Sequence, residues 1–234
     1  QRIGPDRPRQ AQLVQRRAVT GQRDALPVQR LRLRLQADHL FLLGLHLRRR
    51  DELVAAQRLQ PLQRLLGQRQ TLADSGAPVF WHSTIADVPP GPAIFIANEF
   101  FDALPVRQYV RTQMGWCERM VGLDQAGHFI FGLSGEPEPY LTAEAPVGAI
   151  LEISAEGQRT MTALAARIMT QGGALLAIDY GHTRTDLGES LQAVREHRYA
   201  DPLESPGEAD LTTHVDFAAL GRAARSTGCA VHGP

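Results

Sequence analysis

Two short apolar runs stand out along the chain, at residues 93–97 and 174–178, because neither alternates with polar residues. Runs of this length without alternation are typical of strands buried on both faces of a parallel sheet. Shorter apolar runs at 78–81 and 229–231 predict a further strand and the start of another. The pattern therefore predicts an α/β sheet in the second part of the chain.

Alternating apolar and polar residues occupy 106–111, 116–123 and 128–133, and turn sequences at 113–115 and 124–127 separate them. Alternation with short turns predicts an antiparallel β-meander. Two helices follow from capping residues: one from Ser154 to about Thr170, before Gly172, and one from Asp216 to about Ser226.

The first 67 residues show no clear period, which favours an irregular or helical segment. Residues 1–70 hold 15 Arg against five acidic residues, whereas residues 71–234 hold 10 Arg against 20, so the net charge of zero conceals two oppositely charged parts. A basic extension often binds nucleic acid or membranes. Nucleic acid is not expected as a partner here, because the arginines alternate with leucines and lack stacking aromatic residues.

Several classes of protein are not expected. The apolar run at 40–45 is too short for a membrane span, and neither an initiating Met nor a secretory signal occurs. Cys117 and Cys229 are isolated, which argues against disulfides and a zinc site. The sequence therefore predicts a cytoplasmic protein without a membrane span.

Polar and aromatic side chains gather where the two apolar strands end. The first strand is followed by Asn98, Glu99, Phe100, Phe101 and Asp102, and the second by Asp179, Tyr180 and His182. Ligands of open α/β sheets bind at the carboxyl ends of strands. The carboxylates can accept a guanidinium or a proton, and Asn98 can orient a nucleophilic nitrogen. Alternatively, Glu99 and Asp102 cap the next turn, Asp179 satisfies loop amides, and His182 is an ordinary surface histidine.

A polar segment at 201–216 is longer than a simple connection requires. Such segments are either lids over a site or solvated loops. The sequence contains no G-x-S-x-G, P-loop, H-E-x-x-H or C-x-x-C motif, so hydrolase and metalloenzyme functions have no support and no metal is expected.

Three motifs together resemble the bacterial MidA-like proteins: ANEFFDALPVRQ at 97–108, GGALLAIDYGH at 172–182 and GEADLTTHVDF at 207–217. The resemblance covers about residues 68–234. A mitochondrial relative is an S-adenosylmethionine-dependent protein arginine methyltransferase that assists assembly of respiratory complex I. The resemblance implies S-adenosyl-L-methionine as cofactor, and a protein substrate or respiratory-complex subunit as partner.

The family fold is a class I, Rossmann-like methyltransferase sheet with strand order 3-2-1-4-5-7-6. By resemblance, residues 78–81, 93–97, 174–178 and 229–231 would form strand three, strand four, strand five and the start of strand six, and 106–147 an insertion. Asn98, Glu99 and Asp102 would orient the substrate, and His82 and Ser83 would lie near the adenine. The substrate side would be lined by Phe100, Phe101, Asp179, Tyr180, His182, Asp210, Thr212 and Asp216.

The sequence departs from the family in its first part. The family's Gly-rich cofactor loop and the ribose-binding acid after its second strand have no counterpart in residues 1–67. That segment is rich in Gln, Leu and Arg. Translation of the opposite DNA strand of a GC-rich gene for an Ala/Leu-rich protein would give the same composition. We therefore expect 1–67 to be mistranslated or disordered, and 68–234 to be a fragment of a methyltransferase domain.

Two functions compete. The first is a methyltransferase acting on a protein arginine, here without its cofactor loop, so that binding of the cofactor is in question. The second is a non-catalytic assembly or partner-binding module, or an inactive fragment, with the predicted meander as the interaction surface.

Overall fold

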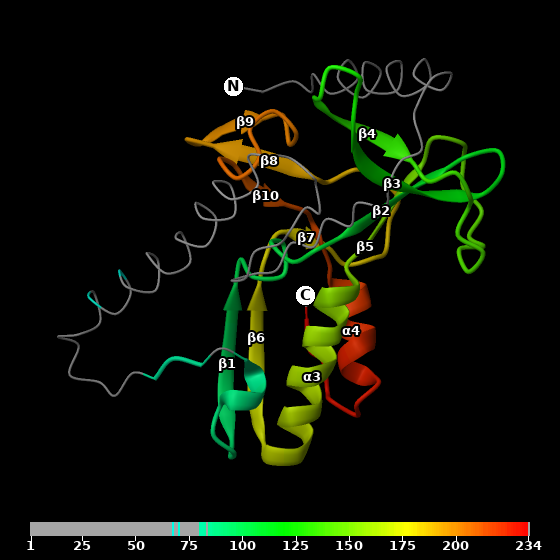
Figure 1. Ribbon diagram of the computed structural model, residues 1–234. Coiled ribbons are helices and arrows are strands. Elements are labelled where there is room, and N and C mark those ends of the chain that lie inside the picture. The colour runs from blue at the N-terminus through cyan, green and yellow to red at the C-terminus, as the bar shows by residue number, and fades with distance from the viewer. Residues whose placement is uncertain (1–66, 68–69, 71–79, 83, 234) are drawn as a thin grey trace, which may run out of the picture. The chain divides into compact units, whose positions relative to one another are not determined.

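A computed structural model describes residues 67, 70, 80–82 and 84–233 (Figure 1). The expected segment 1–67 lies outside the described residues except for Gly67. The described chain forms two compact units. One comprises Gln108–Glu152, and the other comprises the residues up to 107 and from 153 onwards.

The larger unit is built on two parallel strands, β1 (Ala93–Asn98) and β6 (Gly173–Ile178). Ala93 pairs with Gly173 and Asn98 with Ile178, so both strands end at the same level. Two helices, α3 (Ala155–Gln171) and α4 (Phe217–Arg225), pack against each other beside the strands (Figure 1). The buried core of this unit consists of Ala97, Phe101, Leu104, Met161, Ala165, Val215, Leu220 and Ala224.

The prediction that β1 and β6 are each buried on two faces is wrong, because one face of each strand is exposed. Ile94 is 80% exposed and Ile96 is 71% exposed, and Leu176 of β6 is also exposed. Ala97 and its neighbours on the opposite face pack against the core. An apolar run predicts burial, but it does not reveal which face has a partner.

Both predicted helix starts are confirmed. The Ser154 hydroxyl accepts a hydrogen bond from the Gly157 backbone N–H at 3.1 Å. A carboxylate oxygen of Asp216 accepts one from the Ala219 N–H at 2.8 Å. After α3 the chain enters β6 through Gly173, where a Cβ would lie 1.9 Å from the carbonyl oxygen of Ala93. Only glycine permits this approach of the two strands.

The smaller unit is an antiparallel sheet. It contains β2 (Arg107–Arg111), β3 (Trp116–Leu123), β4 (Phe129–Leu133) and β5 (Ile150–Ile153), in the order β4-β3-β2-β5. The sequence did not predict β5. Tyr109, Trp116 and Cys117 are fully buried, and the Trp116 indole N–H donates to the Ala143 carbonyl at 2.8 Å.

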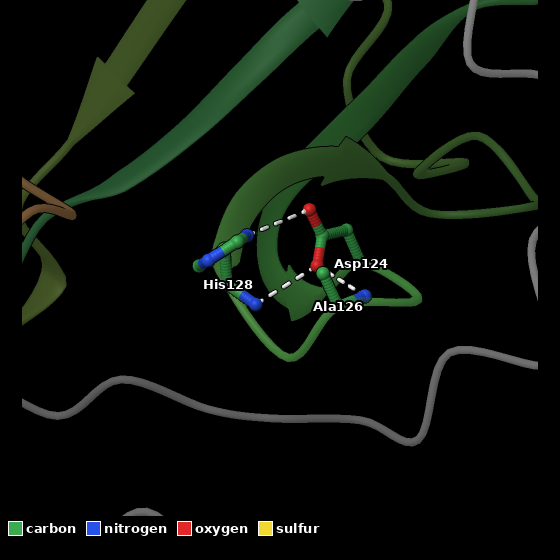
Figure 2. Close-up of polar contacts among 3 residues, drawn as sticks. All are labelled: Asp124, Ala126 and His128. Atoms are coloured by element: carbon green, nitrogen blue, oxygen red, sulfur yellow. Dashed lines mark hydrogen bonds and ion pairs between the residues drawn. The ribbon is translucent and has the colours of Figure 1, made fainter.

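A single carboxylate organises the β3–β4 turn (Figure 2). Asp124 Oδ1 accepts hydrogen bonds from the backbone N–H groups of Ala126 at 2.9 Å and His128 at 2.8 Å. Oδ2 lies 3.3 Å from Nδ1 of His128. The bond from the His128 backbone is the main cause that lowers the pKa of Asp124. This turn therefore favours the ionised acid.

Short strands occupy the polar region after β6. They are β7 (Gly181–His182), β8 (Gln192–Arg195), β9 (Arg198–Ala200), β10 (Asp210–Thr212) and β11 (Val215–Asp216). β8 lies between β9 and β10 in an antiparallel sheet, and β11 pairs with β7 in parallel. The interpretation of 201–216 as a lid or a solvated loop therefore omitted two strands, β10 and β11.

The β8–β9 hairpin, which precedes that segment, was also not predicted, and its turn gives the reason. Glu196 and His197 both have positive φ, 51° and 61°, as the two-residue hairpin turns of type I′ require. Asn-Gly is the usual signal for that turn, and Glu-His gives no such signal.

Two predicted strands are absent from the described parts of their segments. Phe80 and Trp81 have no regular structure, and residues 78 and 79 lie outside the described chain. Residues 229–231 are also irregular. A short helical turn, η1 (Ile85–Asp87), precedes β1. Among the described residues, no helix is long and apolar enough to cross a membrane.

Candidate functional site

The candidate site is the turn that follows β1. The Glu99 N–H donates to the Ile178 carbonyl at 2.8 Å, so it extends the contact between the two parallel strands by one residue. Glu99 then adopts a φ of 46°, in the left-handed region that non-glycine residues rarely enter. Such a conformation costs about 1–2 kcal/mol and persists only where the surroundings enforce it.

Asp179, the first residue after β6, supplies the enforcing contacts. Its Oδ2 accepts hydrogen bonds from the backbone N–H groups of Phe100 at 3.1 Å, Phe101 at 2.9 Å and Asp102 at 3.2 Å. Its Oδ1 accepts one from the Tyr180 N–H at 2.9 Å. Consecutive N–H groups that converge in this way form an anion-binding nest. These contacts agree with the alternative prediction that Asp179 accepts hydrogen bonds from loop amides.

Asp102 lies at the end of the same turn and is 8% exposed. Its Oδ1 is buried without a hydrogen-bond partner. Burial raises the pKa of Asp102, and the negative charge of Asp179 raises it further, whereas a backbone hydrogen bond from Ala103 acts in the opposite direction. An acid with an unpaired buried oxygen at the mouth of a sheet is a candidate for ligand binding.

The other residues of the turn divide between surface and core. The side chains of Asn98 and Glu99 are exposed, so both can reach a ligand. Phe101 is buried in the core, and the Phe100 ring meets it edge to face with centroids 5.2 Å apart. Phe101 thus anchors the turn by packing, while Phe100 is only partly buried.

The neighbouring motif lies beside this turn. Tyr180 is exposed, and its carbonyl accepts from the Val215 N–H at 2.8 Å. The Thr213 N–H donates to the Asp102 carbonyl at 3.0 Å. Sequence reasoning did not select Thr213, although it is a buried polar residue within the third motif. These contacts bring parts of all three motifs to one end of the β1–β6 pair.

Asp216 has structural partners. Besides capping α4, it accepts a hydrogen bond through Oδ2 from the Thr185 hydroxyl at 2.6 Å. Arg222 donates to that same hydroxyl at 3.1 Å. The side chain therefore ties the segment after β7 to the start of α4.

The remaining predicted residues are placed less centrally. Nδ1 of His182 lies 2.5 Å from the Arg184 carbonyl. Asp210 and Thr212 lie on β10, where the Gln192 amide donates to the Thr212 hydroxyl at 3.2 Å. His82 is exposed and outside any strand or helix, and Ser83 lies outside the described residues.

Two further observations bear on the chemistry. Within the described chain no group of three or more His, Cys, Asp or Glu side chains is arranged to hold a metal ion. A surface hollow along α4, lined in part by Phe217, Arg222 and Val231, contains none of the predicted site residues.

Comparison with known proteins identifies relatives for most of the chain. The family model described as "Putative S-adenosyl-L-methionine-dependent methyltransferase" matches residues 52–234. The match begins upstream of the boundary that the sequence predicts after residue 67.

Named relatives are mitochondrial protein arginine methyltransferases called NDUFAF7. The Danio rerio protein is 40% identical over 153 residues, which are 62% of this chain and 36% of that protein. The Homo sapiens protein is 34% identical over 174 residues, which are 70% of this chain and 39% of that protein. This chain thus spans little more than a third of the length of these relatives.

Two solved bacterial structures also match this chain. A Burkholderia thailandensis protein matches with a TM-score of 0.58 and 28% identity, over 69% of this chain and 46% of that one. A second Burkholderia thailandensis structure, bound to S-adenosyl-homocysteine, matches with a TM-score of 0.54 and 26% identity over 76% of this chain and 46% of that one. The prediction of a cytoplasmic protein is contradicted by the named relatives, which are mitochondrial.

Proposed function

Because this chain belongs to the MidA-like family of S-adenosyl-L-methionine-dependent methyltransferases, we propose that it forms the acceptor-binding part of an enzyme that methylates a protein arginine. The observation that carries this proposal is the buried, unpaired Oδ1 of Asp102 at the strand ends, beside the exposed carboxylate of Glu99. The names of the relatives supply the substrate class.

The residues of the turn suit a guanidinium. Two carboxylates within four residues can accept its N–H groups, and charge-assisted hydrogen bonds of this kind are stronger than neutral ones. Asn98, whose side chain is exposed at the end of β1, can orient the nitrogen that reacts. Methyl transfer requires that nitrogen to be held in line with the methyl group, so positioning is the main contribution of these residues.

S-adenosyl-L-methionine is the cofactor of the family and supplies an electrophilic methyl group when bound. The described residues fit the acceptor side of such a site, because Asp102 offers an unpaired oxygen there. Of the two residues predicted near the adenine, only His82 is described. Residues 1–67 contain no counterpart of the family's Gly-rich loop, and the match covers only 36% of the Danio rerio protein. We propose from this that the Gly-rich cofactor loop is missing from residues 1–67, and that cofactor binding needs parts of the family domain that this chain does not match.

The proposal extends to the fold and to the partner. β1 and β6 would be strands four and five of a partial class I sheet, and the antiparallel sheet would be an insertion in the sequence that connects them. Residues Tyr180, His182, Asp210, Thr212 and Asp216 would border the acceptor. The partner would be an arginine-bearing protein surface, for which the family resemblance suggests a respiratory-complex subunit.

Peptide binding tests the acceptor site without requiring the cofactor. We expect an arginine peptide to bind the 234-residue chain in calorimetry, and a citrulline peptide of the same sequence to bind at least tenfold more weakly, because citrulline lacks the charge. Equal binding of both peptides would refute recognition of arginine at this site.

Titration of the same chain with S-adenosyl-L-methionine tests the cofactor side. We expect no binding in the micromolar range. Micromolar binding would refute the missing cofactor loop, whereas arginine binding without cofactor binding is the result expected of an acceptor-binding part.

A further inference from the structure

We infer that Asp179 is a positioning residue, which fixes the turn at 98–102 through backbone hydrogen bonds instead of contacting the methyl acceptor. Its role in the reaction rests on the proposed function, but its role in the turn does not.

The hydrogen-bonding capacity of the carboxylate supports this inference. An ionised carboxylate has about four lone-pair sites. Asp179 accepts four backbone N–H groups, three on Oδ2 and one on Oδ1. Oδ2 therefore has no lone pair left, and Oδ1 retains only one, so a bidentate guanidinium is excluded, although the family resemblance places Asp179 on the substrate side.

The geometry of the turn shows why it needs an anion. The N–H groups of Phe100, Phe101 and Asp102 are consecutive and point at one oxygen, an arrangement that leaves three donors unsatisfied if the oxygen is removed. The left-handed backbone of Glu99 starts this convergence. The charge of Asp179 thus stabilises a backbone path that the sequence of the turn does not favour.

The turn is also fixed at both ends by backbone contacts. Glu99 N–H is bonded to the Ile178 carbonyl at 2.8 Å, and the Asp102 carbonyl is bonded to the Thr213 N–H at 3.0 Å. Asp179 acts between these two points. Since one of its donors is the N–H of Asp102, Asp179 sets the backbone from which the Asp102 carboxyl is presented.

Two variants separate positioning from direct contact. Asp179→Ala removes both acceptor oxygens, whereas Asp179→Asn keeps one acceptor oxygen and removes the charge. Asp186→Asn is the matched control, because Asp186 is exposed and accepts a local hydrogen bond from the neighbouring Leu187 N–H at 2.8 Å. Amide hydrogen exchange in the 234-residue chain measures the turn, and calorimetry with the arginine peptide measures the site.

In Asp179→Ala we expect exchange at Phe100, Phe101 and Asp102 to become about 10- to 100-fold faster, the loss typical of charge-assisted hydrogen bonds. Asp179→Asn should show a smaller increase, and Asp186→Asn none. Wild-type exchange at all three amides in Asp179→Ala would overturn the inference. Equal acceleration throughout β1 and β6 would also overturn it, because the effect would then be a general loss of stability.

Peptide binding then distinguishes the two roles. Positioning predicts that affinity falls in step with exchange protection, most in Asp179→Ala and less in Asp179→Asn. If Asp179→Asn retained protection at the three amides but lost all affinity, Asp179 would contact the guanidinium directly and the inference would be wrong. If the wild-type chain bound no arginine peptide, the proposed function would fail while the exchange result would still decide the role of Asp179 in the turn.

Discussion

Replacing Asp102 by asparagine should make the protein more stable at neutral pH and weaken its binding of arginine. The carboxyl is 8% exposed, and its Oδ1 has no hydrogen-bond partner. A buried polar group left unsatisfied costs about 1–3 kcal/mol, and more when it is charged. Asparagine removes the charge, and its amide oxygen can keep the bond from the Ala103 backbone.

The sign follows from the direction of the pKa shift. Burial, and then the charge of Asp179, raises the pKa of Asp102, so the folded chain holds this proton more tightly than the unfolded chain. The free energy of unfolding therefore falls as pH rises from the ordinary value of 3.8 through the folded pKa, and the full cost is present above that window. Asp102→Asn removes this cost, so it should stabilise the protein by about 1–3 kcal/mol at pH 7.

Urea unfolding at several pH values measures the effect. The difference between Asp102→Asn and the wild type should be largest at pH 7 and should shrink towards pH 4, with Asp186→Asn as the exposed control. A variant less stable than wild type at pH 7, or a difference independent of pH, would refute the reasoning. Gain of stability together with loss of arginine affinity would identify Asp102 as a residue kept for function at the expense of stability.

Three further predictions concern the fold. The pKa of Asp124 is lowered, chiefly by the His128 backbone hydrogen bond, so the stabilisation by the ionised carboxylate is present above the ordinary pKa of 3.8 and is lost as pH falls through the folded pKa. Asp124→Asn should therefore reduce the loss of stability at acid pH in urea unfolding, and an unchanged pH profile would contradict this. Met161→Ala, in the core beside α4, should lower the free energy of unfolding by about 2–5 kcal/mol in the same assay, and a loss below 1 kcal/mol would show that the core is not packed there. Glu99→Gly should leave the free energy of unfolding within about 1 kcal/mol of wild type, whereas Glu99→Val should lower it by about 1–2 kcal/mol, because the φ of residue 99 is positive. Equal effects of the two variants in thermal unfolding would argue against the left-handed backbone at this residue.

Local sequence signals predicted the elements whose causes are local. Ser154 and Asp216 start their helices because the capping side chain and the amide that it accepts are three residues apart. The alternating segments likewise coincide with β2, β3 and β4, since period two records the two faces of a strand. The β8–β9 hairpin was missed because Glu196 and His197 carry no turn signal.

The candidate site depended on contacts that sequence spacing does not contain. The motifs indicated which polar residues belong together, but not which of their side chains are already hydrogen-bonded within the protein. Asp179 lies 77–79 residues from the amides that it accepts, and Thr213 reaches Asp102 from another segment.

By itself, the sequence determined the family, the main helices and strands, and the polar residues at the ends of the parallel strands. Only the tertiary structure decided that backbone donors occupy Oδ2 of Asp179 while Asp102 keeps an unpaired oxygen. The physical reason is that hydrogen-bond satisfaction and burial depend on which distant segments meet, and a carboxylate looks the same in the sequence whether its oxygens are occupied or available.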